Sequence, residues 1–270
     1  MPFAQNDGVK IYWAEEGQGE PVLLLMGLGW SSDMWYRTKP LLASKYRTIT
    51  FDNRGAARSD VPAGPYPIAT MASDAAAVLD AAGVESAHLY GVSMGGMIAQ
   101  EFALQYPGRV KSLILGCTAA GGPEAIRAKP EVFDVLMRQG MTAEEAARAI
   151  NPFIYDASTP PSRIEEDLAI RLQWVATVQG YTAQLQGIIM WEAYSRIAKI
   201  SVPTLIVHGE TDQLVPAENG KLIAGRISGS KLVMIPHASH IYSTDQPDAA
   251  HGPVLEFLSE QTSRSAAGAA

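Results

Sequence analysis

The chain has 270 residues, of which 47% are hydrophobic and 18% are charged, a balance that is typical of one large compact domain and excludes an intrinsically disordered chain. The net charge of −7 comes without any cluster of basic residues, which excludes an electrostatic surface for nucleic acid or anionic lipid. The single cysteine, Cys117, excludes an intramolecular disulfide bond and a cysteine-based zinc site.

No targeting segment is recognisable in the sequence. The first residues contain neither the basic nor the apolar region of a secretory signal. The longest apolar run, 22–30, is far shorter than the roughly 20 residues that a membrane-spanning helix needs. We therefore expect a soluble, cytoplasmic protein with no membrane partner and no nucleic-acid partner.

Short apolar runs alternate with longer segments of helical pattern, which predicts an α/β fold with a mostly parallel sheet flanked by helices. The first strand is expected to be antiparallel. Strands are expected at 9–13, 21–26, 47–52, 86–90, 110–116, 203–207 and 231–235. Helices are expected at 70–82, 94–106 and 248–259.

Residues 121–195 interrupt this alternation because they contain no convincing strand. We interpret 121–195 as a helical lid, or cap, inserted into an α/β core that consists of 1–120 and 196–262. Residues 263–270 carry no core-forming side chains and are expected to be a disordered tail. The expected helices of the lid are separated by residues that interrupt helices: Pro130, Gly140, Pro152 and Pro160-Pro161.

The run Gly91-Val92-Ser93-Met94-Gly95 matches the pattern G-x-S-x-G. Alone the pattern is weak evidence, but here it follows an expected strand and precedes an expected helix. In that context the serine occupies a sharp turn with its hydroxyl exposed above the sheet. Ser93 is therefore the candidate nucleophile, and the alternative is a glycine-rich turn in which the serine has no function.

A serine nucleophile needs a general base, normally a histidine that is oriented by a carboxylate. In this topology the chain order is serine, acid, histidine. Asp212 follows the strand at 203–207, with Glu210 as the rival acid. His237 and His240 both follow the last strand, and spacing alone leaves them level. The remaining histidines are interpreted as structural or exposed: His88, His208 and His251.

Acyl transfer also requires N–H donors for the oxyanion that develops on the substrate. The candidates are the backbone N–H groups of Met94 and of Leu28, which lies in the loop Gly27-Leu28-Gly29. That loop is not the dinucleotide fingerprint G-x-G-x-x-G, and the sequence has neither a phosphate-binding loop nor an H-E-x-x-H metal motif. We therefore expect no cofactor and no metal.

These motifs together resemble the α/β-hydrolase fold superfamily over nearly the whole chain. Within it, the chain is most similar to small bacterial carboxylesterases, 3-oxoadipate enol-lactonases and perhydrolases of the non-haem peroxidase type. The segments that carry the resemblance are MGL at 26–28, DNRGAARSD at 52–60, GVSMGGMIAQEFALQYPGRVKSLIL at 91–115, HGETDQLVP at 208–216 and HASHIYSTDQP at 237–247.

The resemblance implies that His240 is the catalytic histidine, because His237 falls on a glycine of the family pattern, and that Asp212 is the acid. Dehalogenases and epoxide hydrolases of this fold have an aspartate as nucleophile, so Ser93 argues against both. The chain departs from the family pattern in loop detail at Met26, Ala57, His237 and Ser239.

The expected activity is hydrolysis of carboxylic esters or lactones through an acyl-enzyme on a Ser93–His240–Asp212 triad, with a small molecule as substrate. The lid is rich in aromatic residues and poor in convergent cations, which favours an apolar acyl group over a dianion and includes acyl-homoserine-type lactones. The lid residues expected to line the substrate pocket are Trp191 above all, with Phe133, Phe153, Trp174 and Tyr194.

Two other functions are compatible with the sequence. The same triad serves perhydrolases of the non-haem peroxidase type and C–C bond hydrolases. The fold also serves as a non-catalytic ligand receptor, which the intact triad argues against.

Overall fold

The computed structural model describes residues 2–137 and 140–268, with side chains described as far as Ser263. Eight strands form one sheet in the order β1-β2-β4-β3-β5-β6-β7-β8. β1 and β2 pair antiparallel with their neighbours, and the other strands are parallel, which confirms the predicted fold class. The strands are β1 (Phe3–Asn6), β2 (Val9–Glu16), β3 (Pro21–Leu25), β4 (Arg47–Phe51), β5 (Ala87–Val92), β6 (Val110–Gly116), β7 (Thr204–Gly209) and β8 (Lys231–Ile235).

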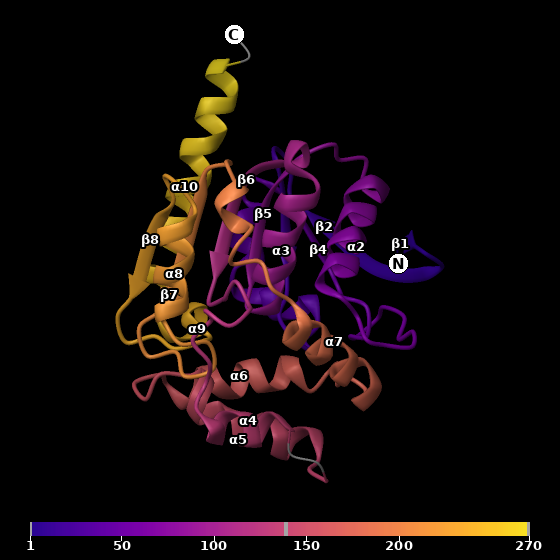
Figure 1. Cartoon of the computed structure of the whole chain (residues 1–270), viewed down its shortest axis with the longest axis vertical. Coiled ribbons are helices and arrows are strands. Elements are labelled where there is room, and N and C mark those ends of the chain that lie inside the picture. Colours follow the sequence, from indigo (N-terminus) through magenta and orange to yellow (C-terminus); the bar gives the residue numbers. More distant parts are fainter. Residues whose placement is uncertain (1, 138–139, 269–270) are drawn as a thin grey trace.

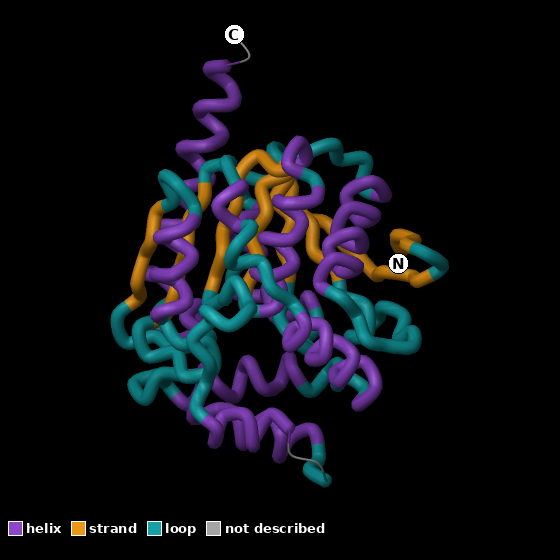
Figure 2. The backbone as a smooth tube through the Cα atoms, viewed as in Figure 1, coloured by secondary structure: helices purple, strands orange, loops and turns teal. Residues whose placement is uncertain are grey.

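Helices cover both faces of the sheet (Figures 1 and 2). α2 (Ile68–Ala81), α3 (Met94–Gln105) and α8 (Glu218–Arg226) contribute to the core on one face. The helical segments of the other core include η1 (Ser32–Arg37), α1 (Lys39–Ala43), α9 (Tyr242–Asp245) and α10 (Pro247–Gly268).

Each central strand contributes side chains to both of these cores, because successive residues of a strand point to opposite faces. In β3, Leu23 and Leu25 join the first core, whereas Val22 and Leu24 join the second. Burial on both faces explains why the strands read as unbroken apolar runs rather than as alternating patterns.

Four helices lie between β6 and β7 and pack at the end of the sheet where the parallel strands finish (Figure 1). They are α4 (Pro130–Met137), α5 (Ala143–Ile154), α6 (Pro161–Arg171) and α7 (Val178–Met190). We call α4–α7 and their connections the helical insertion.

One expected break inside the helical insertion is wrong. Pro152 lies within the last turn of α5 and does not end it. A proline removes one helical hydrogen bond, but Pro152 lies only two residues before the end of α5, and a capping box between Thr142 and Glu145 secures the start of that helix.

The C-terminal segment also differs from expectation. The sequence predicts a disordered tail over 263–270, but α10 continues to Gly268 and projects beyond the sheet (Figure 1). Extending an existing helix costs far less than starting one, and the alanines of this segment favour helix. Residues 269 and 270 lie outside the described part. Over the described ranges, no helix is both long and apolar enough to cross a membrane.

Candidate active site

Ser93 lies in the turn between β5 and α3 and adopts φ 55° and ψ −123°, a left-handed conformation that is uncommon for a residue with a side chain. Two glycines make this turn sterically feasible. A Cβ atom on Gly91 would lie 2.2 Å from the carbonyl oxygen of Gly95, and one on Gly95 would lie 2.0 Å from the carbonyl oxygen of Leu25. The glycines of the G-x-S-x-G motif are therefore required by contact between strand, turn and helix.

Hydrogen bonds hold the Ser93 backbone in this conformation. Its N–H donates to the carbonyl of Gly116 over 2.9 Å, and its carbonyl accepts from the Thr118 hydroxyl over 2.7 Å and from two N–H groups of α3. Ser93 is half-buried, and these bonds fix the backbone from which its side chain extends.

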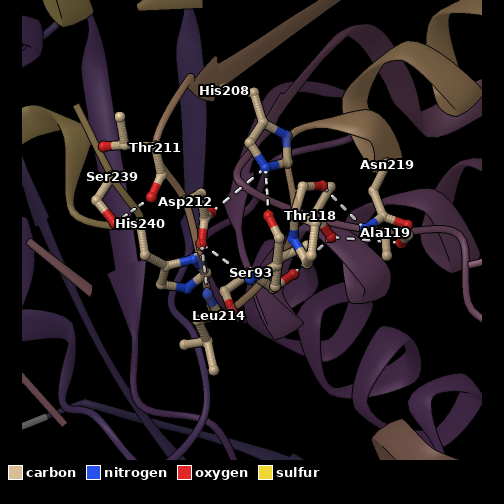
Figure 3. A network of polar contacts seen from close by, with 12 residues as sticks. Ser93, Thr118, Ala119, His208, Thr211, Asp212, Leu214, Asn219, Ser239 and His240 are labelled. Atoms are coloured by element: carbon tan, nitrogen blue, oxygen red, sulfur yellow. Dashed lines mark hydrogen bonds and ion pairs between the residues drawn. The ribbon is translucent and has the colours of Figure 1, made fainter. Parts of the chain in front are cut away.

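Asp212 and His240 are joined directly (Figure 3). His240 Nδ1 lies 2.8 Å from Asp212 Oδ2, and the other carboxylate oxygen accepts the N–H groups of Leu214 and Val215 over 2.9 and 2.8 Å. Because the carboxylate is an acceptor, Nδ1 carries the proton and Nε2 is left as an acceptor. Burial raises the pKa of Asp212, but the contacts to His240 and His208 outweigh burial and hold that pKa below its usual value.

His208, which was interpreted as structural or exposed, is fully buried and contacts the same carboxylate (Figure 3). Its Nε2 lies 2.8 Å from the carbonyl oxygen of Val215 and 3.3 Å from Asp212 Oδ2. Its Nδ1 is buried without a hydrogen-bond partner among the described residues. Because the Val215 carbonyl can only accept, His208 Nε2 carries a proton and donates it. The one signal in the sequence was its position four residues before Asp212.

Ser93 lies near this pair, but its hydroxyl has no hydrogen bond to His240 in the described structure. Cys117 interacts with both groups: burial and the charge of Asp212 raise the pKa of its thiol, and a hydrogen bond with the Ser93 backbone offsets only part of that rise. Catalytic hydrogen bonds are often long in unliganded enzymes and shorten when substrate binds. The arrangement can thus perform nucleophilic catalysis by Ser93 with His240 as base.

The alternative acid, Glu210, and the alternative base, His237, differ from Asp212 and His240 in their exposure to solvent. Glu210 and His237 are exposed to solvent, whereas Asp212 and His240 are buried. Burial and mutual contact make Asp212 and His240 the better candidates.

The candidate oxyanion donors flank Ser93. A Cβ atom on Gly27 would lie 3.7 Å from Ser93 Oγ, so the loop that carries Leu28 passes close to the hydroxyl. The N–H groups of Leu28 and Met94 make no hydrogen bond within the described chain. Gln184 of α7 accepts the Gly29 N–H over 2.8 Å and so ties this loop to the helical insertion.

The helical insertion covers the site with an apolar cluster. Tyr155 and its buried neighbours on α4 and α5 pack against Trp30, Leu214 and Ile241. These three residues follow the oxyanion loop, Asp212 and His240 in the sequence. The Ile241 N–H also donates to the carbonyl of Ile154 over 2.9 Å. The helical insertion thus touches the loops that carry Leu28, Asp212 and His240.

The structure brings only one of the five expected pocket residues to this cluster, namely Phe153. Phe133 is 39% exposed on α4. Trp174 donates its indole N–H to Asp33 over 2.9 Å, and Arg226 stacks on the Tyr194 ring.

Trp191 was the leading expectation, and the structure places it elsewhere. Its indole N–H donates to Glu101 of α3 over 2.8 Å, and its ring packs in the core of the α3 face. Trp191 docks the end of the helical insertion onto the core. The residues that lie over the site and that sequence reasoning missed are Trp30, Tyr155 and Arg171, since their convergence depends on the orientation of whole helices.

Comparisons with known proteins agree with this geometry. The family model for the alpha/beta hydrolase fold matches residues 20–247. The RutD protein of Azorhizobium caulinodans, which carries the name of a carbamate hydrolase, is 34% identical over 96% of this chain and 99% of its own. The 3-oxoadipate enol-lactonase 2 of Acinetobacter baylyi is 30% identical over 89% of this chain and 90% of its own. The solved structure of Est816, described as an N-acyl homoserine lactone degrading enzyme, superposes with a TM-score of 0.81 at 28% identity, covering 95% of this chain and all of its own.

Proposed function

This chain belongs to the α/β-hydrolase fold family, and on that premise we propose that it is a serine hydrolase that cleaves carboxylic esters or lactones. Ser93 is the nucleophile, His240 the general base and Asp212 the acid that orients the imidazole. The observation that carries the proposal is the left-handed Ser93 turn beside a buried, hydrogen-bonded Asp212–His240 pair.

The proposed reaction has two halves. His240 Nε2 accepts the Ser93 proton while Oγ attacks the acyl carbon, and the N–H groups of Leu28 and Met94 stabilise the oxyanion. The protonated His240 then donates to the departing alkoxide, which leaves an acyl-enzyme. Water, deprotonated by His240, cleaves the acyl-enzyme and releases the carboxylic acid. Asp212 stabilises the imidazolium that forms in both halves.

We assign the helical insertion the role of a lid over the substrate. Its contacts with Trp30, Leu214 and Ile241 enclose the acyl group in an apolar environment, which supports a substrate with an apolar portion. The names of the enol-lactonase and of the lactone-degrading enzyme support lactones alongside linear esters.

The test is hydrolysis of p-nitrophenyl butyrate and of a simple lactone by the wild-type chain and by Ser93→Ala. We expect turnover and organophosphonate labelling in the wild type, and the loss of both in Ser93→Ala with thermal stability unchanged or raised, because the strained turn is relieved. Ser228→Ala, at an exposed serine, is the matched control and should be labelled like wild type. Labelling of Ser93→Ala at the wild-type rate would refute the assignment.

Carbamate hydrolysis is the second candidate, because the relative with that name is 34% identical over nearly the full length of both chains. The same triad would form a carbamoyl-enzyme in place of an acyl-enzyme. Rates on p-nitrophenyl N-methylcarbamate and p-nitrophenyl acetate, compared in one assay, separate the two. A perhydrolase, by contrast, would produce peracid from acetate and hydrogen peroxide.

A further inference from the structure

The helical insertion places one cation above the oxyanion loop. The guanidinium of Arg171, the last residue of α6, lies over the Trp30 ring at 4.7 Å from its centroid. Trp30 directly follows Gly29 in the sequence, and it lines the same cavity as His240. Arg171 therefore lies beside the oxyanion loop, on a ring that lines the cavity. Arg37 also lines that cavity, but its guanidinium is paired with Glu166 and Asp167.

Tyr181 provides a second indication of where the Arg171 guanidinium lies. Its ring packs against Gly29, since a Cβ atom on that glycine would lie 2.9 Å from Tyr181 Cδ2. Burial raises the pKa of Tyr181 to about 12, and the charge of Arg171 opposes that rise, which indicates that the two groups are neighbours. Arg171 thus stacks on the residue that follows Gly29, and its charge acts on the ring that packs against Gly29.

This cation forms no salt bridge with a carboxylate of the described residues. Arg171 donates a hydrogen bond over 3.2 Å to the side-chain amide oxygen of Asn151 and interacts with the Tyr155 hydroxyl, and Asp167 acts on it only from a distance. Asp167, one turn earlier in α6, is the nearest candidate in the sequence. Its carboxylate is already occupied by Tyr36, Arg37, Tyr155 and Thr244.

Two other arginines that are buried or half-buried are paired with carboxylates. Carboxylates outweigh burial and raise the pKa of Arg54 beside Asp74 and of Arg58 beside Asp52. For Arg171, burial lowers the pKa more than Tyr155 and Asp167 raise it. Arg171 is half-buried, and a guanidinium that loses part of its hydration without a salt bridge costs free energy unless an anion compensates it.

We propose that Arg171 binds a carboxylate of the substrate, so that the substrate is an ester or lactone carrying one carboxylate group. A guanidinium matches a carboxylate with two parallel N–H···O bonds, and the Trp30 ring holds its plane. This inference rests on the proposed hydrolase function and specifies its substrate class. It also revises the expectation of a purely apolar substrate, because the fold brings one cation into a lid that looked poor in convergent charge.

A purely structural role for Arg171 predicts a different result. As the last residue of α6, it would stabilise the helix end and dock on Trp30. Its loss would then affect all substrates alike, because a displaced helix changes the pocket for every acyl group. A role in carboxylate recognition changes the ratio between charged and neutral substrates.

The experiment compares two p-nitrophenyl esters with acyl groups of five carbons, the neutral valerate and the half-ester of glutarate, which ends in a carboxylate. The quantity measured is the ratio of kcat/KM for glutarate to kcat/KM for valerate. We expect Arg171→Gln to lower this ratio by about tenfold or more, since a charge-assisted bidentate pair is lost. A fall of less than about tenfold overturns the proposal.

Arg148→Gln is the matched control, because Arg148 is an exposed arginine of the helical insertion whose charge is paired with Glu144 and Glu165. Its ratio should equal that of wild type. If Arg171→Gln fails to fold, inhibition of wild-type p-nitrophenyl acetate hydrolysis decides: glutarate should compete and neutral pentanamide should not. Equal inhibition by the two compounds, or none by either, overturns the proposal. A wild-type chain that hydrolyses neither ester refutes the proposed function instead, which separates the two failures.

Discussion

At the scale of single residues, the least expected feature is that two histidines share one carboxylate oxygen. Asp212 Oδ2 is 2.8 Å from His240 and 3.3 Å from His208, and Oδ1 is held by two N–H groups. A carboxylate bound on every side cannot rotate away from His240 when the imidazole becomes charged. We therefore assign His208 a positioning role, although it touches no reacting atom.

His208→Leu should lower kcat by about tenfold with little change in KM, because a mispositioned base acts in the transition state and not in binding. Without His208, the pKa of Asp212 rises toward its usual value. As the pH is lowered, activity should therefore begin to fall at a higher pH than in wild type. His208→Gln keeps an N–H donor and should recover part of kcat. Steady-state kinetics between pH 4 and 9 provide the measurement, and a His208→Leu profile that superposes on wild type would exclude the positioning role.

The two histidines of the β8–α9 loop should behave very differently. His240→Gln should lower kcat/KM by roughly 10³-fold or more, because the general base is lost. His237→Gln changes an exposed side chain and should retain activity within about threefold, since surface substitutions seldom perturb a site. An inactive His237→Gln beside an active His240→Gln would reverse the assignment of the base.

At the scale of elements, the loop that carries His240 is bound to the helical insertion through a buried carboxylate. Asp245 accepts the Ser239 N–H over 2.6 Å and the Thr159 hydroxyl over 2.5 Å. Burial raises the pKa of Asp245 to about 6, and these hydrogen bonds offset only part of that effect. Asp156, one of the charged groups nearby, raises it further.

Asp245 should therefore make the protein less stable as the pH rises. Its folded pKa of about 6 is above the ordinary value of about 3.9, so the folded state binds the proton more tightly than the unfolded state does. The free energy of unfolding should fall between about pH 4 and pH 6, by up to about 3 kcal/mol, and then level off. Asp245→Asn cannot titrate, while its amide retains an oxygen for Ser239 and an N–H for Thr159. Urea unfolding at pH 4, 5, 6 and 7 should show a shallower pH dependence in Asp245→Asn, and an unchanged slope would contradict this account.

The contact between Trp191 and Glu101 tests whether Trp191 docks the helical insertion or lines the pocket. Trp191→Phe keeps most of the packing and removes one donor from the buried Glu101 carboxylate, which still has Arg196 at 2.8 Å. We expect a loss of about 1–2 kcal/mol in the free energy of unfolding. The dependence of kcat/KM on acyl chain length, from acetate to hexanoate, should parallel that of wild type. A flatter dependence of kcat/KM on acyl chain length in the variant would show instead that Trp191 lines the pocket.

Element prediction from the sequence succeeded where burial produces a simple pattern. The strands at 110–116 and 231–235 have the expected bounds, because apolar residues dominate both short runs. α8 was not predicted, since its sequence ENGKLIAGR has no clear apolar stripe. Its Gly220 is explained only by the fold, because a Cβ atom there would lie 2.9 Å from His208 Nδ1.

At the scale of the whole molecule, the groups of the site that follow strands could be predicted from the sequence, and the groups that come from helices could not. Ser93, Asp212 and His240 could be proposed from the sequence because each follows a strand, and the carboxyl ends of parallel strands meet at one edge of the sheet. The groups over the site come from helices whose orientation is set by tertiary contacts. Arg171 reaches Trp30 across more than a hundred residues of sequence, whereas Trp191, more obvious by its size, turns toward α3.

The projecting end of α10 bears on the stability of the whole molecule. Val254, Phe257 and Leu258 are buried in the core, while the helix beyond Ser263 runs past the edge of the sheet (Figure 1). A chain that ends at Ser263 should keep the hydrolase activity of the full chain and its free energy of unfolding within about 0.5 kcal/mol, as expected for removal of surface residues. A chain that ends at Gly252 exposes the groove that those three side chains fill and should lose about 5 kcal/mol or more, which is comparable to the entire stability of many domains. Urea unfolding of both truncated chains, with p-nitrophenyl butyrate hydrolysis as the second measurement, checks the pair. If the chain ending at Ser263 were destabilised as strongly as the shorter one, the projecting turns of α10 would have to be covered by a second copy of the protein, and light scattering of the full chain would then show a dimer.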